Sequence, residues 1–168
     1  NVPNVVHDQY SVVSSAVSLL EQAGYQISVA VLAAHRLGWP QTRRRFFLVA
    51  TRNLQTITLP QAMSVMERDA LPVSWAIDDL VKTTDAGGSG TFNRSSSLSD
   101  ANRSRVEWLF ANKEYDLPND ERPDCHKDGH SYPAVYGRMR ADQPSGTITG
   151  GFLSPGRGRF VHPRVPRS

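Results

Sequence analysis

The fold is decided by the stretch Gly38-Trp39-Pro40-Gln41-Thr42-Arg43-Arg44-Arg45-Phe46-Phe47-Leu48-Val49-Ala50, which passes from a turn through a cationic block into an apolar run. Proline has no amide donor and biases the residue before it toward extended geometry, so we expect a turn to end at Pro40. The apolar run at residues 46–50 predicts a short buried strand. The three arginines then lie at the mouth of that strand, where a planar guanidinium suits phosphate oxygens and base edges. A solvated sheet edge is the alternative explanation for such a block.

An amphipathic helix and another strand precede this stretch. Apolar residues recur at helical spacing over residues 12–23. Asp8 or Ser11 is suited to cap that helix, and Gly24 is suited to end it. Residues 25–32, Tyr-Gln-Ile-Ser-Val-Ala-Val-Leu, are rich in strand formers. The connection between the two strands is too short for a crossover helix, so the sequence predicts an antiparallel pair.

Regular structure is expected to be sparser beyond residue 52. Two short helices are predicted, at residues 60–66 and 73–80. Residues 83–97 are rich in Gly, Ser and Thr, which is typical of a flexible loop. A longer helix is predicted at residues 101–113, with Asp100 as its cap. Its apolar face is formed by Val106, Leu109 and Phe110.

Cys125, His126 and His130 lie in the polar interval 115–133, which we predict to be mostly loop. A zinc site is one interpretation, but the usual ligand spacing is absent and no fourth ligand is evident, so we assign no metal. A nucleophilic Cys–His pair is another, although adjacent residues rarely face one another. The third interpretation is a polar loop that orders the region around it.

Two basic stretches flank an acidic middle, although the net charge is only +3. Residues 36–52 contain five arginines and no acid, and residues 137–168 contain six arginines against Asp142. Residues 67–130 contain thirteen acids and eight bases. This distribution suits two segments that converge on a polyanion such as nucleic acid. Unrelated charged surfaces are the alternative.

Length and composition set further bounds. A chain of 168 residues suits one ordinary domain. Its single cysteine, Cys125, forms no internal disulfide, which suits a reducing compartment, and we expect a cytoplasmic protein. No apolar run approaches the ~20 residues that span a bilayer, and no signal-peptide pattern opens the chain, so we expect no membrane association.

Several segments resemble the DNA cytosine-5 methyltransferases of bacteria. Gln41-x-Arg43-x-Arg45 before an apolar strand resembles the eighth motif of that family. The segment from Arg138 to Thr149, with its Pro-x-x-Thr-Ile-Thr core, resembles the ninth. Asn1-Val2 match the second and third residues of the sixth motif, Glu-Asn-Val. The segments follow the family's order and span nearly the whole chain.

The resemblance implies an α/β fold. It would be the C-terminal part of a Rossmann-like methyltransferase sheet, present as a helix and an antiparallel strand pair, followed by a small, loop-rich target-recognition domain. We expect the end of the catalytic domain at residues 1–52 and the target-recognition region at residues 53–134. A ninth-motif segment at residues 135–168 would return to the catalytic domain.

The resemblance also implies a function. A full member of the family binds S-adenosylmethionine mainly on its N-terminal half and flips a cytosine out of duplex DNA. The cysteine of a Pro-Cys-Gln motif attacks C6, and C5 then takes the methyl group. We therefore expect double-stranded DNA as the partner, S-adenosylmethionine as the cofactor, a monomer at full length, association with the bacterial nucleoid and a place in restriction–modification.

Site residues carry over from the matching motifs. Arg45 would contact the flipped cytosine and its backbone, while Gln41 and Arg43 would brace the base pocket. Asn1 would be a cofactor contact. Hydroxyls, arginines and closely approaching glycines in the ninth-motif region suit phosphate. The expected DNA contacts are Arg138, Arg140, Thr147, Thr149, Arg157 and Arg159.

The catalytic cysteine motif is not in the chain. It contains no Pro-Cys-Gln, no Phe-x-Gly-x-Gly for the cofactor and no glutamate before Asn1, so we expect a middle-to-late fragment that is inactive alone. Two functional classes remain. One is part of a DNA cytosine-5 methyltransferase, and the other is a non-catalytic DNA-binding remnant or a subunit that needs a partner fragment. A hydrolase that uses Cys125 is a third, more remote class.

Overall fold

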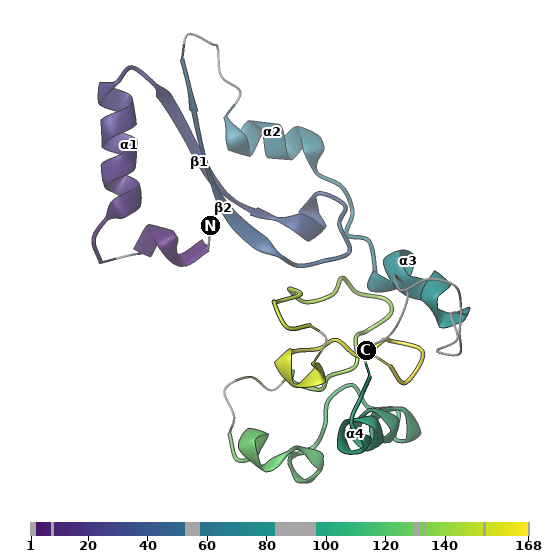
Figure 1. Cartoon of the computed structure of the whole chain (residues 1–168). Helices are drawn as coiled ribbons and strands as arrows, with labels where there is room; N and C mark the ends of the chain where they lie inside the picture. The colour runs from purple at the N-terminus through teal and green to yellow at the C-terminus, as the bar shows by residue number, and fades with distance from the viewer. Residues whose placement is uncertain are drawn as a thin grey trace. The chain divides into compact units, whose positions relative to one another are not determined.

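The computed structural model describes residues 3–7, 9–52, 58–82, 97–129, 132, 134–152 and 154–167. The chain divides into two compact units, Asn1–Ala70 and Leu71–Ser168, called here the first and second unit (Figure 1). Each is described by itself. The functional division at residues 52 and 134 stays a prediction.

The first unit contains the predicted helix and strand pair. Its elements are a short 3-10 helix Pro3–His7, α1 Val12–Gln22, β1 Gln26–Ala33, a 3-10 turn Ala34–Arg36, β2 Arg44–Thr51 and α2 Leu59–Met66. Gly24 ends α1 as expected, with φ at +80°, while the N–H of Tyr25 donates to the carbonyl of Leu20 at 3.0 Å. Ser11 occupies the N-cap position but makes no side-chain cap bond. Asp8 lies outside the described residues.

The two strands pair antiparallel, which confirms the prediction. The register runs from Gln26 opposite Thr51 to Ala33 opposite Arg44. The predicted start of the second strand was wrong, because β2 begins at Arg44 and not at residue 46. Pairing with β1 extends the ladder into the cationic block, so Arg44 and Arg45 lie inside the strand rather than before it.

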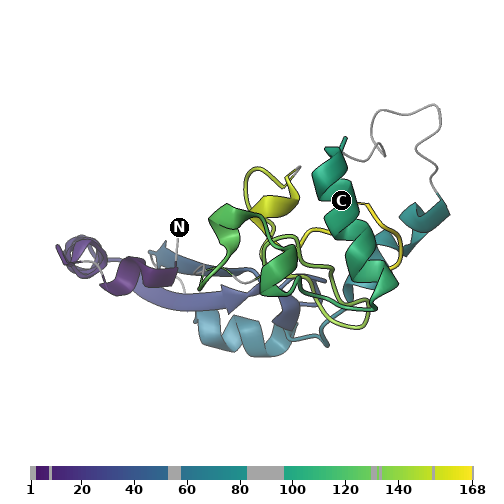
Figure 2. The same cartoon turned by 90° about the horizontal axis from the view of Figure 1, so that it is seen from below.

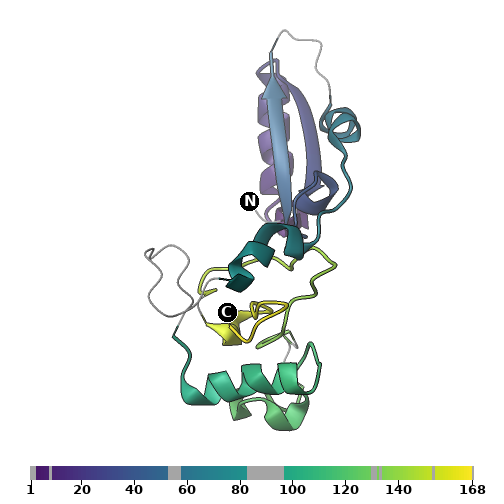
Figure 3. The same cartoon turned by 90° about the vertical axis from the view of Figure 1, so that its right-hand side faces the viewer.

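The helices α1 and α2 lie on opposite faces of the strand pair (Figures 1 and 3). The N–H of Leu59, at the start of α2, donates to the Ser28 hydroxyl at 2.7 Å, which places the Ser28 face of the sheet under α2. A reciprocal capping box between Thr58 and Gln61 begins the helix. Both faces keep apolar exposure, since Val29 is 44% exposed and Phe47 is 39% exposed.

The second unit has less regular structure (Figure 2). Its elements are α3 Val73–Ile77, a 3-10 helix Asp78–Lys82, α4 Asp100–Ala111 and 3-10 turns at Asn119–Glu121, Asp124–His126 and Pro155–Arg157. The helix predicted at 73–80 is therefore split after Ile77. Ser99 caps α4 in place of the expected Asp100, because its hydroxyl accepts from the N–H of Asn102. Most of the predicted loop at 83–97 lies outside the described residues.

An apolar core holds the second unit together. Its buried members are Val106, Leu109, Leu117, Val135, Tyr136 and Val161, and Phe110 packs against them. The predicted apolar face of α4 is confirmed. The interval 115–133 is mostly loop as expected, yet Leu117 from this interval is only 1% exposed. Among the described residues, no helix has the length and apolar character to cross a membrane.

Candidate nucleic-acid interface

The arginine block of the first unit points to both faces of the sheet. Side chains alternate along a strand, so Arg44 and Arg45 face opposite ways. Arg44 is exposed, whereas Arg45 is half-buried and its Nη1 donates to the Arg44 carbonyl at 2.7 Å. Gln41 and Arg43 are half-buried and precede the strand. The roles expected of Gln41, Arg43 and Arg45 in a base pocket stay a prediction.

The arginines at the ends of this basic stretch bind within the unit. Arg36 forms an ion pair with Glu67 at 2.6 Å. Arg52 donates from Nη2 to the Ala23 carbonyl at 2.8 Å, and its guanidinium lies 4.5 Å from the centre of the Tyr25 ring. Arg52 therefore caps the C-terminal end of α1. Two of the five arginines in this stretch, Arg36 and Arg52, therefore make contacts that stabilise the first unit.

A polar cavity of about 430 Å³ lies beside Arg36. The Nδ1 atom of His35 is buried and has no hydrogen-bond partner among the described residues. Arg68 donates from Nη1 to the carbonyl of Glu67 at 2.7 Å. The lining residues are His35, Arg36, Glu67, Arg68, Asp69 and Ala70. This cavity carries charges of both signs and no aromatic ring besides the imidazole.

Arg159 is the best-connected arginine of the second unit. Its Nη1 donates to the carbonyls of Tyr115 at 2.9 Å and Arg138 at 3.0 Å. Its Nη2 donates to Asp116 Oδ1 at 2.5 Å. The close fit extends to Gly137, where a Cβ atom would meet the Arg159 side chain at 3.1 Å. Arg159 thus joins three parts of the chain that are distant in sequence.

Arg138 is also used internally. Its Nε donates to the Pro163 carbonyl at 2.8 Å. Its guanidinium lies 4.1 Å from the centre of the Phe110 ring and 5.3 Å from that of Tyr115. The backbone N–H of Arg138 donates to the Tyr115 carbonyl at 2.9 Å. Sequence reasoning missed Tyr115 and Asp116, although an aromatic and an acid directly after a predicted helix were visible.

Arg140 and Arg157 differ from these two arginines. Both are exposed, and neither side chain makes a hydrogen bond to any residue that the structure describes. The Arg140 guanidinium lies 4.1 Å from the centre of the Tyr115 ring. Of the two expected threonine contacts, Thr147 is half-buried and Thr149 is exposed. The expected cofactor contact, Asn1, lies outside the described residues.

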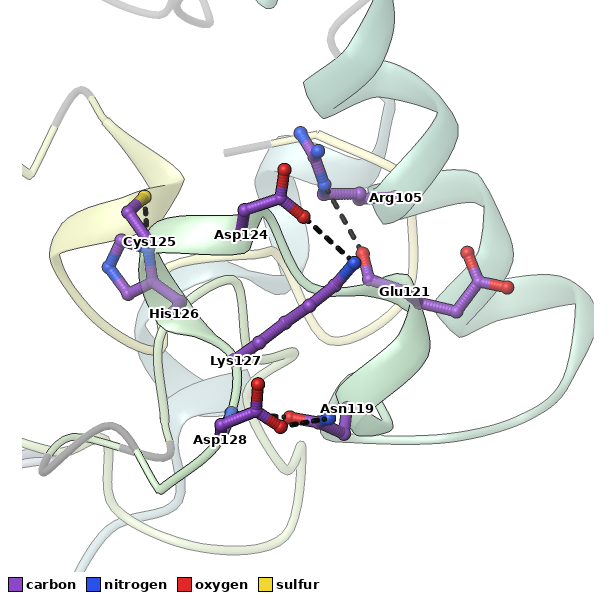
Figure 4. Close-up of polar contacts among 8 residues, drawn as sticks. All are labelled: Arg105, Asn119, Glu121, Asp124, Cys125, His126, Lys127 and Asp128. Carbon is purple, nitrogen blue, oxygen red and sulfur yellow. Dashed lines mark hydrogen bonds and ion pairs between the residues drawn. The ribbon is translucent and has the colours of Figure 1, made fainter.

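Cys125 and His126 contact one another, contrary to expectation (Figure 4). The Cys125 Sγ lies 3.1 Å from His126 Nδ1, because a 3-10 turn brings the two neighbours together. The His126 ring packs edge-on against Tyr136, whose pKa is raised by burial. Among the described residues, no group of three side chains that could bind a metal occurs. His130 lies outside the described residues.

The same turn belongs to a loop that is closed on itself (Figure 4). Asn119 and Asp128 exchange two hydrogen bonds, at 3.1 and 2.9 Å. The hydrogen bond between Lys127 and Asp124 lowers the pKa of the carboxyl and raises that of the ammonium. A cavity of about 580 Å³ separates this loop from α4. It is lined by Ala101, Ser104, Arg105, Trp108, Asp120, Glu121, Arg122, Pro123, Asp124 and Lys127.

Comparison with known proteins finds bacterial DNA methyltransferases. The chain is 43% identical to the Type II methyltransferase M1.BsuMI of Bacillus subtilis (strain 168), over the whole chain and 39% of that protein. It is 31% identical to the Type II methylase M.HgiDII of Herpetosiphon aurantiacus, over the whole chain and 49% of that protein. A third relative, the Type II methyltransferase M.MspI of Moraxella sp, is 41% identical over 54 residues, which are 32% of the chain and 13% of that protein.

The chain spans less than half the length of the relatives that match it from end to end. No solved structure matches it. The model of the family described as C-5 cytosine-specific DNA methylase matches residues 1–148. Since that match covers most of the chain, the chain belongs to the C-5 cytosine-specific DNA methylase family.

Proposed function

We propose that this chain is the DNA-contacting part of an enzyme that transfers a methyl group from S-adenosylmethionine to C5 of a flipped cytosine in duplex DNA. The observation that carries the proposal is the position of Gln41-x-Arg43-x-Arg45 at the start of β2, in a chain that matches a Type II methyltransferase from end to end. The partner is double-stranded DNA, and the system is one of restriction–modification.

The first unit contributes to the base pocket. A flipped cytosine presents carbonyl oxygen, ring nitrogen and flanking phosphate, and these are acceptors for a guanidinium. Arg45 is the favoured contact because it is half-buried near the start of β2, where its hydrogen bond to the Arg44 carbonyl limits its freedom. Gln41 and Arg43 would brace it from the connection that leads into β2.

The second unit contributes to DNA recognition. It brings Arg138, Arg140 and Arg159 together around Tyr115. Thr147 and Thr149 lie in the loop after this cluster, and Arg157 ends the 3-10 turn Pro155–Arg157. The charge of Arg157 and the two threonine hydroxyls suit the phosphate backbone.

The covalent chemistry lies outside this chain. C5 of a neutral pyrimidine is a poor nucleophile, so the reaction needs a cysteine that adds to C6. Cys125 is the only cysteine, and it is preceded by Asp124 rather than by the proline of Pro-Cys-Gln. Neither cavity described above suits S-adenosylmethionine, since charged side chains make up most of the lining of both. We therefore assign no cofactor step to these residues.

A second candidate is a DNA-binding subunit that works with a separate catalytic chain. The two candidates make different demands on the coding sequence. One continuous reading frame that joins Pro-Cys-Gln and the glutamate to Asn1 supports the single enzyme, and a stop codon before Asn1 supports the subunit.

The activity is tested with the protein made from the complete reading frame that encodes this chain. It is incubated with duplex DNA and S-adenosylmethionine labelled in the methyl group, and bisulfite sequencing then locates 5-methylcytosine. We expect label in DNA and methylation at one sequence. Label on adenine, or no transfer under conditions in which the protein binds DNA, would contradict the proposal.

A further inference from the structure

We propose that Arg140 is a specificity-determining residue that binds the edge of a guanine, and that Arg138 and Arg159 are positioning residues that hold its support in place. This inference rests on the proposed function and deepens it. It separates the basic residues of the second unit into two groups that the sequence treats alike. The ligand of Arg140 is a base edge with two acceptors side by side.

Arg138 and Arg159 each use part of their guanidinium within the unit. A guanidinium has five N–H donors in a fixed fork. Arg159 uses both of its terminal nitrogens, on two carbonyls and on Asp116. Arg138 uses Nε on Pro163, and its face lies on Phe110. Binding DNA through Arg159 would break an ion pair and two hydrogen bonds.

The N–H donors of the Arg140 guanidinium remain available to a ligand. Its side chain is exposed and donates no hydrogen bond to the part of the chain that the structure describes. Its guanidinium nevertheless has a fixed partner, because it lies 4.1 Å from the centre of the Tyr115 ring. Stacking on an aromatic face limits the orientation of the fork and lowers the entropy lost on binding. The Arg140 guanidinium is therefore restricted in orientation while its N–H donors remain available.

Tyr115, on whose ring Arg140 stacks, is itself held in place by hydrogen bonds. The Tyr115 carbonyl accepts from Arg159 Nη1 and from the backbone N–H of Arg138. Tyr115 follows α4 closely, and Leu109 in that helix is fully buried. The backbone of Tyr115, which carries the ring on which Arg140 stacks, is thus held by two other arginines.

An oriented fork suits a base more than a phosphate. Guanine presents O6 and N7 side by side in the major groove, and arginine bound to both is the most common specific contact in protein–DNA complexes. A phosphate attracts any nearby cation, whatever its orientation, and carries no sequence information. An aromatic support for Arg140 adds little to a phosphate contact, whereas it adds discrimination to a guanine contact.

Arg157 provides a matched control. It is exposed, and its side chain likewise makes no hydrogen bond within the described part of the chain. It lies beside Gly151, and no aromatic ring stacks on it among the described residues. We assign Arg157 to a phosphate, so the two arginines should respond differently to the same substitutions.

The test uses the protein made from the complete reading frame and a pool of duplexes with randomised positions around a cytosine. Single-turnover methylation is read by bisulfite sequencing, and the salt dependence of duplex binding is measured by fluorescence anisotropy. Arg140→Lys keeps the charge but removes the planar fork. We expect preference for guanine at one position to fall about 5- to 150-fold, with the salt slope unchanged.

Two further substitutions check the support and the control. Tyr115→Leu should relax the same position, whereas Tyr115→Phe keeps the ring and should keep the preference. Arg157→Lys should leave the preference unchanged, and Arg157→Ala should flatten the slope of log K against log salt by about 0.9 without changing the preferred sequence.

The inference is overturned if Arg140→Lys keeps the wild-type preference at every position, or if the relaxed position is not a guanine. Arg140 is exposed, so this variant decides the question even if Tyr115→Leu fails to fold. A wild-type protein that methylates no duplex would overturn the proposed function and the inference together. A wild-type protein that methylates one sequence, with Arg140→Lys unchanged, would overturn the inference alone.

Discussion

The first unit contains both strands and two of the longer helices, yet Ser28 is its only buried residue in the part that the structure describes. The second unit has one long helix and many turns, and it holds the apolar core. Its buried apolar side chains are Val73, Val106, Leu109, Leu117, Val135, Tyr136, Met139, Phe160 and Val161.

The comparison of the two units shows that the unit with more regular secondary structure is not the one with the apolar core. Periodic apolar residues are enough to specify α1 and the strand pair, but a two-stranded sheet is marginal in water without further packing. Apolar side chains of the first unit stay in contact with solvent, including Leu19 at 67% exposure and Val49 at 37%. We expect the second unit to carry most of the free energy of unfolding of this chain.

The largest expected effect is on the core of the second unit. Leu109→Ala should lower the free energy of unfolding by about 3 kcal/mol, because it removes a fully buried side chain and leaves a cavity. Leu19→Ala in α1 should change it by less than about 0.5 kcal/mol. Urea denaturation of the 168-residue chain, followed by circular dichroism, measures both. Equal losses would remove the contrast between the units.

Arg159→Ala should have the next largest effect. It removes three hydrogen bonds that tie Tyr115, Asp116 and Arg138 together. The side chains of Arg159 and Asp116 are 27% and 45% exposed, so we expect a loss of about 2 kcal/mol rather than the 3–5 kcal/mol of a fully buried pair. Arg157→Ala serves as the control, and a loss as large as that of Arg159→Ala would contradict the structural assignment.

A smaller and local effect is expected in the first unit. Thr58→Ala breaks the capping box of α2 and should cost that helix about 1 kcal/mol. Amide hydrogen exchange should quicken at residues 59–66, while exchange in α4 stays as in the wild type. Faster exchange at Leu109 in this variant would show that the two units unfold together.

The smallest effect concerns pH and His162. Burial lowers the pKa of His162, and its Nδ1 accepts from the N–H of Arg164 while Nε2 donates to the Ile77 carbonyl. The folded state thus favours the neutral ring. Its contribution to stability is present above the usual pKa of 6.5 and is lost as the pH falls from 6.5 through the lowered native value.

His162→Gln removes this titration. Below pH 6.5 the melting temperature of the wild type should fall more steeply with pH than that of the variant. Arg164 pairs with Asp78 at 2.8 Å beside the ring, so Arg164→Gln is a useful second variant for separating that ion pair from the imidazole. Parallel pH profiles for wild type and His162→Gln would exclude the ring as the titrating group.

The sequence predicted the elements whose information is local. Helix α1, both strands, their antiparallel pairing and the Val106–Leu109 face of α4 follow from periodicity and loop length. The start of β2 was misjudged because pairing with Ala33 draws Arg44 into the ladder, and cationic residues carry no strand signal of their own. The cap of α4 was misjudged by one residue, since Ser99 and Asp100 suit the position equally well.

The organisation of the second unit was hidden for a different reason. Leu117, Val135 and Val161 are buried, but they lie singly in segments without periodicity. Their burial depends on contacts between residues distant in sequence, such as the parallel bridge of Arg138 with Val161. The different uses of Arg138, Arg140 and Arg159 are likewise set by tertiary contacts, so charge counting treats them as equal.

The central claim, that Arg45 serves the base pocket of a cytosine-5 methyltransferase, is tested most directly by comparing Arg45→Ala with Arg44→Ala. The two arginines are neighbours on opposite faces of β2. In the protein made from the complete reading frame, single-turnover methylation of the preferred duplex should slow about 100-fold in Arg45→Ala, the loss typical of one hydrogen-bond donor in a reacting site. Arg44→Ala should slow it less than about 3-fold, a loss well below that of such a donor. Equal losses in the two variants would contradict the account.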